Sequence, residues 1–252
     1  EDGVAVLQAA TRAAWPETAM LRLSDPEESR LLGLLSRLRH SQSTKGRIKQ
    51  AMQDQLLRLR GLREHVILIV GLEGKQRDVT FTTRKIQRLA RVHRGMDAGT
   101  AAGNSWLKGR FNLPYLRNHL IPAGIGVDTF ETAVAYSRLF ELRENVYRTF
   151  QKTCKQGRIM SHLSHTYPDG VCIYFTIFFA LEKDPVKQWH RLKEAVSGAV
   201  TESGGNISHH HGIGLDHKSW FQKTNPTACS WIGQFKADLD PAGIMNPGKL
   251  VD

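Results

Sequence analysis

The sequence predicts an α+β fold in which an antiparallel sheet is covered by helices on one face. The first observation behind this class is the order of patterns after residue 64, which reads strand, helix, strand, helix, strand, strand, helix. The second is a hairpin. Two apolar strands at 158–166 and 171–181 are separated by Tyr167-Pro168-Asp169-Gly170, a segment typical of a tight turn, so we expect the two strands to pair antiparallel.

The part of the chain before residue 64 is mainly helical. Its one strand, 19–24, is short and stops at Asp25-Pro26, a dipeptide that favours a turn. Apolar residues recur at helical spacing on both sides of this strand, and a segment rich in Ser, Gln, Lys and Gly at 40–47 is typical of an exposed loop. The predicted helices of this part are 4–14, 27–39 and 47–60.

The part of the chain after residue 64 contains the remaining predicted strands. The first clear one lies at 64–72, where the β-branched run 65–70 is closed by a glycine, and another is predicted at 124–132. The Gly-rich segment 95–105 is expected to be a loop. Asp184-Pro185 begins a helix, because proline suits the first helical position. The predicted helices of this part are 77–93, 106–109, 114–120, 133–156, 185–202 and 218–236.

The composition is that of a folded globular protein. Of 252 residues, 40% are hydrophobic and 23% charged, which excludes a disordered chain and allows one large or two small domains. The longest apolar runs are far shorter than the roughly 18 residues of a membrane-spanning helix, and we expect no signal peptide. Three widely separated cysteines without a CxxC pair predict reduced thiols in a cytoplasmic protein.

The chain is strongly basic. Its 35 Lys and Arg residues against 24 Asp and Glu residues give a net charge of +11, so it prefers anionic partners. A phosphorylated small molecule, an anionic membrane surface and a missing acidic domain all qualify. Arg84, Arg88 and Arg91 form one stripe of a helix, but few aromatic residues accompany them and no nucleic-acid motif is present. A solvated helix face explains the stripe, and no nucleic-acid partner is predicted.

Three consecutive histidines, His209, His210 and His211, are the most unusual motif. Glycines flank them on both sides and allow the backbone to approach a ligand closely. Imidazoles act as donors, acceptors and general acids or bases near neutral pH. The alternative is a surface loop with chance histidines. A metal site is not predicted, because adjacent residues cannot easily all bind one ion and no carboxylate or Cys ligand stands at a matching spacing.

One tyrosine and two arginines within or beside apolar segments are further candidates for a functional site. Tyr174 shares one strand face with Cys172 and Thr176 by alternation, and a buried phenol needs a hydrogen-bond partner. A core tyrosine is the local alternative. Arg117 follows a Gly-rich region and could clamp a phosphate or carboxylate, although a solvated helix face is the simpler local interpretation. Arg22 alternates with leucines in a short strand, which suggests a side chain that points into a polar cleft.

Together these segments resemble FAD-linked oxidases of the vanillyl-alcohol-oxidase type, and within them the alkylglycerone-phosphate synthase family and its bacterial relatives. The matching pieces occur in the family's order and span nearly the whole chain, so their combination is specific although each alone is weak. The pieces are Leu21-Arg22-Leu23, Gly109-Arg110-Phe111, Pro114-Tyr115-Leu116-Arg117, Glu131-Thr132, Ser164-His165-Thr166-Tyr167, Gly170 with Cys172-Ile173-Tyr174-Phe175, Ser208-His209-His210-His211-Gly212-Ile213-Gly214, and the closing Asp240-Pro241 with Asn246-Pro247-Gly248.

The resemblance implies a domain organisation. An N-terminal domain that holds the FAD pyrophosphate is expected to be absent from this chain and to be its partner, while a ferredoxin-like cap domain supplies the substrate pocket. Residues 1–60 would then be the end of the FAD domain and a linker, 61–207 the cap domain, and 208–252 the histidine loop with a C-terminal helical segment. A homodimer stays open, as does a peripheral position on an anionic membrane surface.

The resemblance also implies a reaction. Enzymes of this kind exchange the acyl chain of an acylated dihydroxyacetone phosphate for a fatty alcohol, with FAD as a scaffold and no net redox change, in ether lipid synthesis. Tyr174 would handle a proton, and His210 would be the base beside the carbonyl. The residues implied are Tyr174, His209, His210 and His211 for catalysis, Arg117, Arg22 and His165 for the substrate, and Arg117, His210 and Asn246 for the cofactor.

Two other functions stay open. The first is an FAD-linked oxidase or dehydrogenase of a D-2-hydroxy acid or another small alcohol. The D-2-hydroxy acid dehydrogenases carry a metal-binding His-rich strand and a Glu-His-Gly-Ile-Gly loop. Here His210 stands in place of that Glu, and the strand keeps His165 but lacks the second His, which argues against this alternative. The second is a non-enzymatic basic binding domain, for which binding would depend steeply on salt and neither Tyr174 nor His210 would matter.

Overall fold

The computed structural model describes residues 1–40 and 65–251. The predicted helix 47–60 lies outside these described residues. Within them the chain forms two compact units. Unit 1 comprises Glu1–Leu116 and Met160–Pro168, and unit 2 comprises Arg117–Ile159 and Asp169–Asp252. The domain boundaries expected at 60 and 207 stay a prediction.

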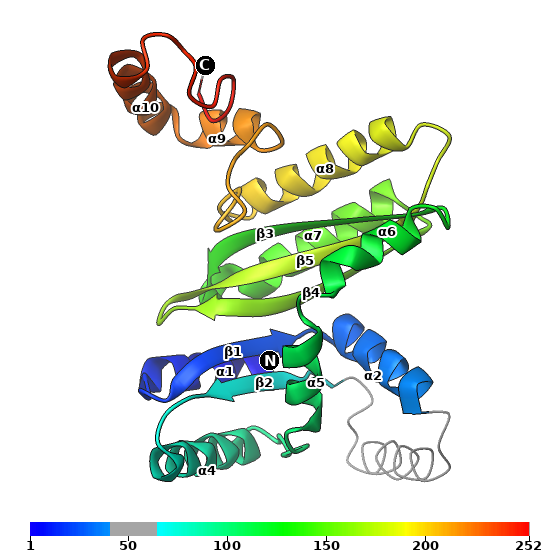
Figure 1. The fold of residues 1–252 in the computed structure, drawn as a ribbon, viewed down its shortest axis with the longest axis vertical. Coiled ribbons are helices and arrows are strands. Elements are labelled where there is room, and N and C mark those ends of the chain that lie inside the picture. Colours follow the sequence, from blue (N-terminus) through cyan, green and yellow to red (C-terminus); the bar gives the residue numbers. More distant parts are fainter. Residues whose placement is uncertain (41–64, 252) are drawn as a thin grey trace. The chain divides into compact units, whose positions relative to one another are not determined.

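Hydrogen bonding orders the five strands as β2-β1-β4-β5-β3 (Figure 1), and the pairs β1–β2, β1–β4 and β3–β5 are antiparallel. Strand β4 contributes residues to both units. These strands and the helices described below confirm the predicted α+β class with an antiparallel sheet. The strands are β1 (Thr18–Ser24), β2 (Leu68–Leu72), β3 (Ile125–Ala135), β4 (Gly157–Thr166) and β5 (Gly170–Ala180).

Unit 1 has a small core around β1. Helix α1 packs against β1 and α4, its Leu7 is fully buried, and Leu21, Leu23 and Ile69 of the strands β1 and β2 are buried as well. Each large apolar side chain buried in this way contributes about 1.5–3 kcal/mol to stability. In the described residues the helical segments of unit 1 are α1 (Asp2–Ala13), α2 (Pro26–His40), α4 (Gln76–Val92), α5 (Ala101–Gly109) and the 3-10 turn η1 (Leu113–Tyr115).

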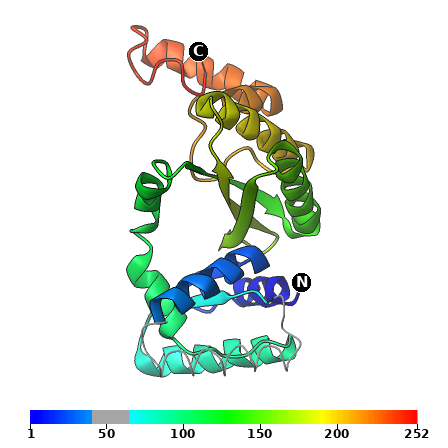
Figure 2. The same ribbon diagram turned by 90° about the vertical axis from the view of Figure 1, so that its right-hand side faces the viewer.

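Unit 2 places α7 and α8 side by side on one face of its strands (Figure 2). Phe175 of β5 lies on this covered face, with its ring 6.3 Å from that of Tyr147 on α7 and 4.8 Å from that of Phe130 on β3. Ile173 and Ile177 alternate with Tyr174 along β5 and are also buried. The helical segments of unit 2 are α6 (Leu116–Leu120), η2 (Tyr136–Arg138), α7 (Leu139–Thr153), α8 (Pro185–Glu202), α9 (Lys218–Thr224) and α10 (Pro226–Leu239).

The register of β3 against β5 decides which side chains meet on the other face. Pairing runs without a break from Ile125 opposite Ala180 to Ala135 opposite Gly170. Glu131 therefore lies directly opposite Tyr174, on the face that α7 and α8 leave uncovered. Because β3 is the last strand of the sheet, a segment that leaves α8 can pass around its edge to this face.

Several predicted boundaries were wrong for local reasons. The helix expected from residue 133 begins at Leu139, because β3 continues to Ala135 in pairing with β5. Part of the segment expected as the loop 95–105 is helical, since α5 begins at Ala101. The helix expected at 218–236 is two helices separated at Asn225-Pro226, because proline lacks the N–H that would continue the first one.

The hairpin between β4 and β5 and the start of α8 are confirmed. Pro185 stands at the first helical position, and the side chain of Asp184 accepts a hydrogen bond of 3.0 Å from the backbone N–H of Lys187. In the described part of the chain, none of the helices is both long and apolar enough to pass through a bilayer.

Candidate functional site

Two glycines allow the loop that carries the histidines to run close along the edge of β3. Gly204, just after α8, has a φ of +77°, which suits glycine and turns the chain back. At Gly205 a Cβ atom would lie 2.5 Å from Thr132 Oγ1 and 2.6 Å from Leu142 Cδ1, so no other residue fits without a shift. The next residue, Asn206, donates its N–H to the carbonyl of Ala133 at 3.1 Å. The loop therefore follows the edge strand closely.

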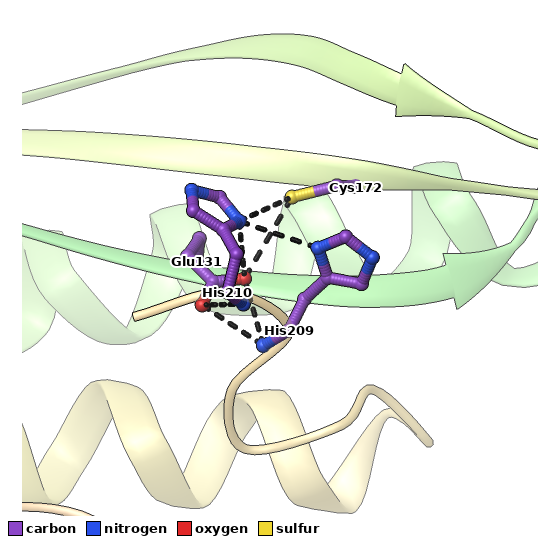
Figure 3. A group of neighbouring side chains, drawn as sticks. All are labelled: Glu131, Cys172, His209 and His210. Atoms are coloured by element: carbon purple, nitrogen blue, oxygen red, sulfur yellow. Dashed lines mark hydrogen bonds and ion pairs between the residues drawn. The ribbon is translucent and has the colours of Figure 1, made fainter. Parts of the chain in front are cut away.

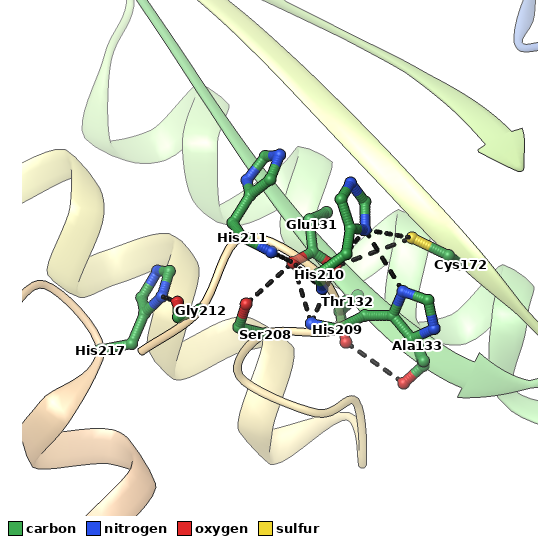
Figure 4. Close-up of polar contacts among 10 residues, drawn as sticks. All are labelled: Glu131, Thr132, Ala133, Cys172, Ser208, His209, His210, His211, Gly212 and His217. Carbon is green, nitrogen blue, oxygen red and sulfur yellow. Dashed lines mark hydrogen bonds and ion pairs between the residues drawn. The ribbon is translucent and has the colours of Figure 1, made fainter. Parts of the chain in front are cut away.

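Glu131 anchors the following residues (Figure 4). Its Oε1 accepts hydrogen bonds from the hydroxyl of Ser208 at 2.8 Å and from the backbone N–H groups of His209, His210 and His211 at 2.8, 2.9 and 3.0 Å. Successive N–H groups that converge on one oxygen form an anion-binding nest. A carboxylate on a strand thus fixes the backbone of all three histidines.

These bonds set the ionisation of Glu131. Its side chain is buried, which alone would raise its pKa, but the N–H groups of the three histidines and the Ser208 hydroxyl outweigh burial and lower the pKa to about 2. The carboxylate is therefore charged at neutral pH, and its charge is stabilised by the loop that it holds.

Cys172 and two imidazoles surround the second oxygen of Glu131 (Figure 3). Cys172 Sγ lies 3.7 Å from Glu131 Oε2 and 3.8 Å from His210 Nδ1. His210 Nδ1 lies 3.5 Å from Glu131 Oε2 and 3.2 Å from His209 Nδ1. Burial and the neighbouring Glu131 charge raise the pKa of the Cys172 thiol to about 12, so it is protonated.

Tyr174 lies among the same imidazoles. Its ring is stacked with that of His210 at 6.1 Å and meets the edge of His211 at 5.2 Å. Burial raises the pKa of the phenol, against the lowering effect of a hydrogen bond with Thr129. Tyr174 is therefore a proton donor at neutral pH, and the face predicted for it by alternation is confirmed, since Cys172 and Tyr174 both border His210.

The structure brings together four of the predicted site residues, Tyr174 and His209–His211. Arg117 and Asn246, predicted for the cofactor and the substrate, lie in the same unit and are exposed; Asn246 has a φ of +47°. Across the described residues, no side-chain hydrogen bond or ion pair joins either of them to the histidines. Their roles stay predictions.

Arg22, predicted for the substrate pocket, is buried in unit 1. One of its amino groups, Nη2, donates to Glu28 Oε1 at 2.7 Å and lies 3.0 Å from His162 Nδ1, and its guanidinium faces the ring of Trp106 at 5.6 Å. The other, Nη1, is buried, and no hydrogen-bond partner for it exists in the part of the chain that the structure describes. A buried guanidinium with an unused donor is suited to an anionic ligand.

The environment of Arg22 makes Glu28 ionised and His162 neutral. Burial would raise the pKa of Glu28, but His162 and Arg22 lower it below its ordinary value. Burial lowers the pKa of His162, and Arg22 lowers it further, while Glu28 opposes both. A neutral His162 accepts the hydrogen bond of Arg22. His165, predicted for the substrate, lies at the exposed end of β4 with a φ of +46°.

No site role was predicted from the sequence for Glu131, Ser208, Cys172 or His162. For Glu131 a signal exists, because β3 has two acidic residues and only Glu131 lies on the face of Tyr174 once the strands are paired in register, whereas Asp128 lies opposite Ile177. No comparable signal marks Ser208 or His162, since their partners are far away in the sequence.

Comparisons with known proteins show which family the chain resembles. The chain is 32% identical to an alkyldihydroxyacetonephosphate synthase of Dictyostelium discoideum, over 92% of this chain and 39% of that protein. It is 30% identical to the synthase of Trypanosoma brucei brucei, over 73% of this chain and 31% of that protein. A solved structure of an alkyldihydroxyacetonephosphate synthase superposes with a TM-score of 0.70 at 24% identity, over 98% of this chain and 41% of that one.

These relatives are longer, and the chain spans less than half the length of each. The model of the C-terminal domain of FAD-linked oxidases matches residues 1–250. The predicted resemblance, including the FAD-linked character of the family, is confirmed, and the chain belongs to the family of C-terminal domains of FAD-linked oxidases.

Proposed function

We propose that the protein which contains this chain is an FAD-dependent enzyme of the alkyldihydroxyacetonephosphate synthase type. It would exchange the acyl group of an acylated dihydroxyacetone phosphate for a fatty alcohol. The observation that carries the proposal is the histidine loop held by Glu131 against Tyr174, which gathers proton donors and acceptors on one uncovered strand face. The identity of the relatives supports the same substrate class.

The residues present fit an FAD isoalloxazine ring as a neighbour. His210 and His211 are exposed on the face of β3 and β5 that α7 and α8 do not cover, and Arg117 and Asn246 are exposed in the same unit. These groups supply hydrogen-bond donors and a positive charge for a ring with polar edges. When bound, FAD would supply an electron-poor ring beside these groups.

Proton transfer is the task of Tyr174 and His210. Tyr174 holds its proton at neutral pH because burial raises its pKa, so it donates. His210 has Nδ1 near Glu131 Oε2, which leaves Nε2 as the acceptor for a proton beside the substrate carbonyl. The carboxylate that orients the imidazole also stabilises its protonated form. His209 and His211 complete the polar wall.

The phosphate needs cationic donors. In unit 1, Arg22 has a buried and unused Nη1 among the described residues, and Glu28 and His162 fix the rest of its guanidinium. In unit 2, Arg117 offers a second, exposed guanidinium. We propose that a guanidinium recognises the phosphate dianion, since its fork matches phosphate oxygens, and that Arg22 and Arg117 are the two candidates, one in each unit.

The experiment is an exchange assay with the full-length protein reconstituted with FAD. Palmitoyl-dihydroxyacetone phosphate and isotope-labelled hexadecanol are supplied, and the labelled ether product and free palmitate are measured by mass spectrometry. The proposal predicts ether product and palmitate in equal amounts with the flavin oxidised at the end. If the flavin is instead bleached by D-2-hydroxy acids and no ether product forms, the dehydrogenase alternative replaces it.

A further inference from the structure

A second group of reactive side chains lies beside the histidine loop, around Glu131 and Cys172. Four potential metal ligands converge there, with ligand atoms all within 4.8 Å of one another (Figure 3). They come from three separate segments: Glu131 from β3, Cys172 from β5, and His209 and His210 from the loop. No metal site was predicted from the sequence, because no carboxylate or Cys ligand stands near the histidines at a matching spacing. Folding supplies both ligands from distant positions.

The distances match the edges of a tetrahedral site. In a zinc centre with bonds of about 2.0–2.3 Å, neighbouring ligand atoms lie about 3.3–3.7 Å apart. Here His209 Nδ1 and His210 Nδ1 are 3.2 Å apart, and His210 Nδ1 is 3.5 Å from Glu131 Oε2. Cys172 Sγ lies 3.7 Å from that oxygen and 3.8 Å from His210 Nδ1. Small shifts of the side chains therefore suffice to close the site.

Charge and burial also suit a divalent ion. A carboxylate and a thiolate together neutralise a charge of +2, and two neutral imidazoles add none. Glu131 and Cys172 are almost completely buried, whereas the side chain of His210 is 33% exposed, which leaves an entry path from the solvent. The other oxygen of Glu131 accepts four hydrogen bonds from Ser208 and the loop backbone, so the ligand is oriented by an outer shell.

We propose that Glu131, Cys172, His209 and His210 bind one Zn²⁺ or a similar thiophilic divalent ion in a four-coordinate site. Binding forms one bond from each ligand atom, breaks the S–H bond of Cys172 and releases its proton to solvent. These nitrogen, sulfur and oxygen ligand atoms favour Zn²⁺ and Co²⁺ over Mg²⁺ or Ca²⁺, which prefer oxygen ligands.

Metal binding would change what His210 offers to the substrate. With Nδ1 bonded to the ion, the proton of a neutral imidazole resides on Nε2, so His210 becomes a donor and no longer a base. This consequence rests on the proposed function, and it predicts that the ion-bound enzyme exchanges alcohol more slowly than the ion-free one. The binding site itself does not depend on that function.

The test uses the full-length protein treated with a chelator and titrated with Co²⁺ alone, followed by competition with Zn²⁺. Tetrahedral Co²⁺ with a thiolate ligand gives intense visible bands and a near-ultraviolet sulfur-to-cobalt band. We expect both, with one ion per chain, and their loss on addition of Zn²⁺. Cys172→Ser should abolish the sulfur band, and His209→Asn, a change at a partly exposed residue, should weaken binding by more than the roughly 10- to 100-fold typical of an outer-shell change.

Two variants are matched controls. Cys229→Ser removes a thiol outside the group, and His211→Asn removes the adjacent imidazole whose side chain is not in it. Both should bind Co²⁺ as the unaltered protein does. Octahedral Co²⁺ without a sulfur band, or binding that survives in His209→Asn, would overturn the site. If Co²⁺ binds as expected but exchange activity is unchanged, the site stands and the role of His210 as base is refuted.

Discussion

Glu131 and Tyr174 lie directly opposite each other in the ladder of β3 and β5, and the histidine loop covers this pair. Glu131 holds the backbone of the loop, and Tyr174 contacts the imidazole rings that the loop presents. One strand pair therefore both holds the loop and supplies the phenol that we propose for proton transfer.

Glu131→Gln should destabilise the protein and reduce exchange activity. The amide keeps the size of the side chain but has one acceptor oxygen and no charge, so several N–H groups of the loop lose their partner. We expect the free energy of unfolding to fall by about 2–4 kcal/mol, measured by urea denaturation. Glu141→Gln, at an exposed position of α7, is the control and should change it by less than about 0.5 kcal/mol. Equal stabilities of the two variants would refute the anchoring role.

Gly205→Ala should displace the histidine loop. The new methyl group would lie 2.5 Å from Thr132 Oγ1 and 2.6 Å from Leu142 Cδ1, so the loop or the edge of β3 must move. Overpacking of this kind costs about 1–3 kcal/mol, and exchange activity should fall with it. Gly233→Ala, in α10 with open space around it, should be neutral or slightly stabilising. Thermal unfolding and the exchange assay of both variants check this, and an unaffected Gly205→Ala would contradict the close packing.

Acid should weaken unit 1 through His162 and Glu28. The groups that face His162 are Arg22, Glu28 and Asp25. The folded pKa of His162 lies below its ordinary 6.5, and that of Glu28 below 4.5, so the unfolded chain binds more protons in both windows. Stability is therefore complete above about pH 6.5 and decreases as the pH falls, first through His162 and then through Glu28.

The measurement is the free energy of unfolding as a function of pH for the unaltered protein and for His162→Gln. The variant should lose the part of the dependence that begins just below about pH 6.5 and keep the part at lower pH that belongs to Glu28. His190→Gln, at an exposed position of α8, should behave as the unaltered protein does. A profile that rises on acidification would show that His162 is charged in the folded state.

Arg22→Met should cost stability because it leaves the buried Glu28 carboxylate without its cationic partner. Removal of one member of a buried ion pair typically costs about 3–5 kcal/mol, whereas removal of both costs less. The double variant Arg22→Met, Glu28→Gln should therefore recover part of the loss, which a double-mutant cycle measures. The affinity for the phosphate substrate should remain low in both. Recovery of substrate affinity in the double variant would exclude Arg22 as a phosphate ligand.

Much of the fold could be predicted from the sequence because its signals are local. The turn 167–170 and the Asp184-Pro185 start of α8 are encoded within a few residues. The extension of β3 to Ala135 could not be predicted, because it depends on pairing with β5, which follows only after α7 and β4. At the site, the histidines and Tyr174 are visible as motifs, whereas Glu131 and Cys172 acquire meaning only when the register places them beside the loop.

The central claim is that the group around Tyr174 and the histidine loop is the active site. The most direct test is single-turnover exchange with Tyr174→Phe in the FAD-loaded, full-length protein, with Tyr147→Phe on the opposite face as the matched control. We predict that Tyr174→Phe keeps the flavin absorbance of the unaltered enzyme and loses at least about 100-fold in rate, as expected for removal of a general acid. Tyr147→Phe should exchange normally. A Tyr174→Phe enzyme with full activity would contradict the assignment of this site.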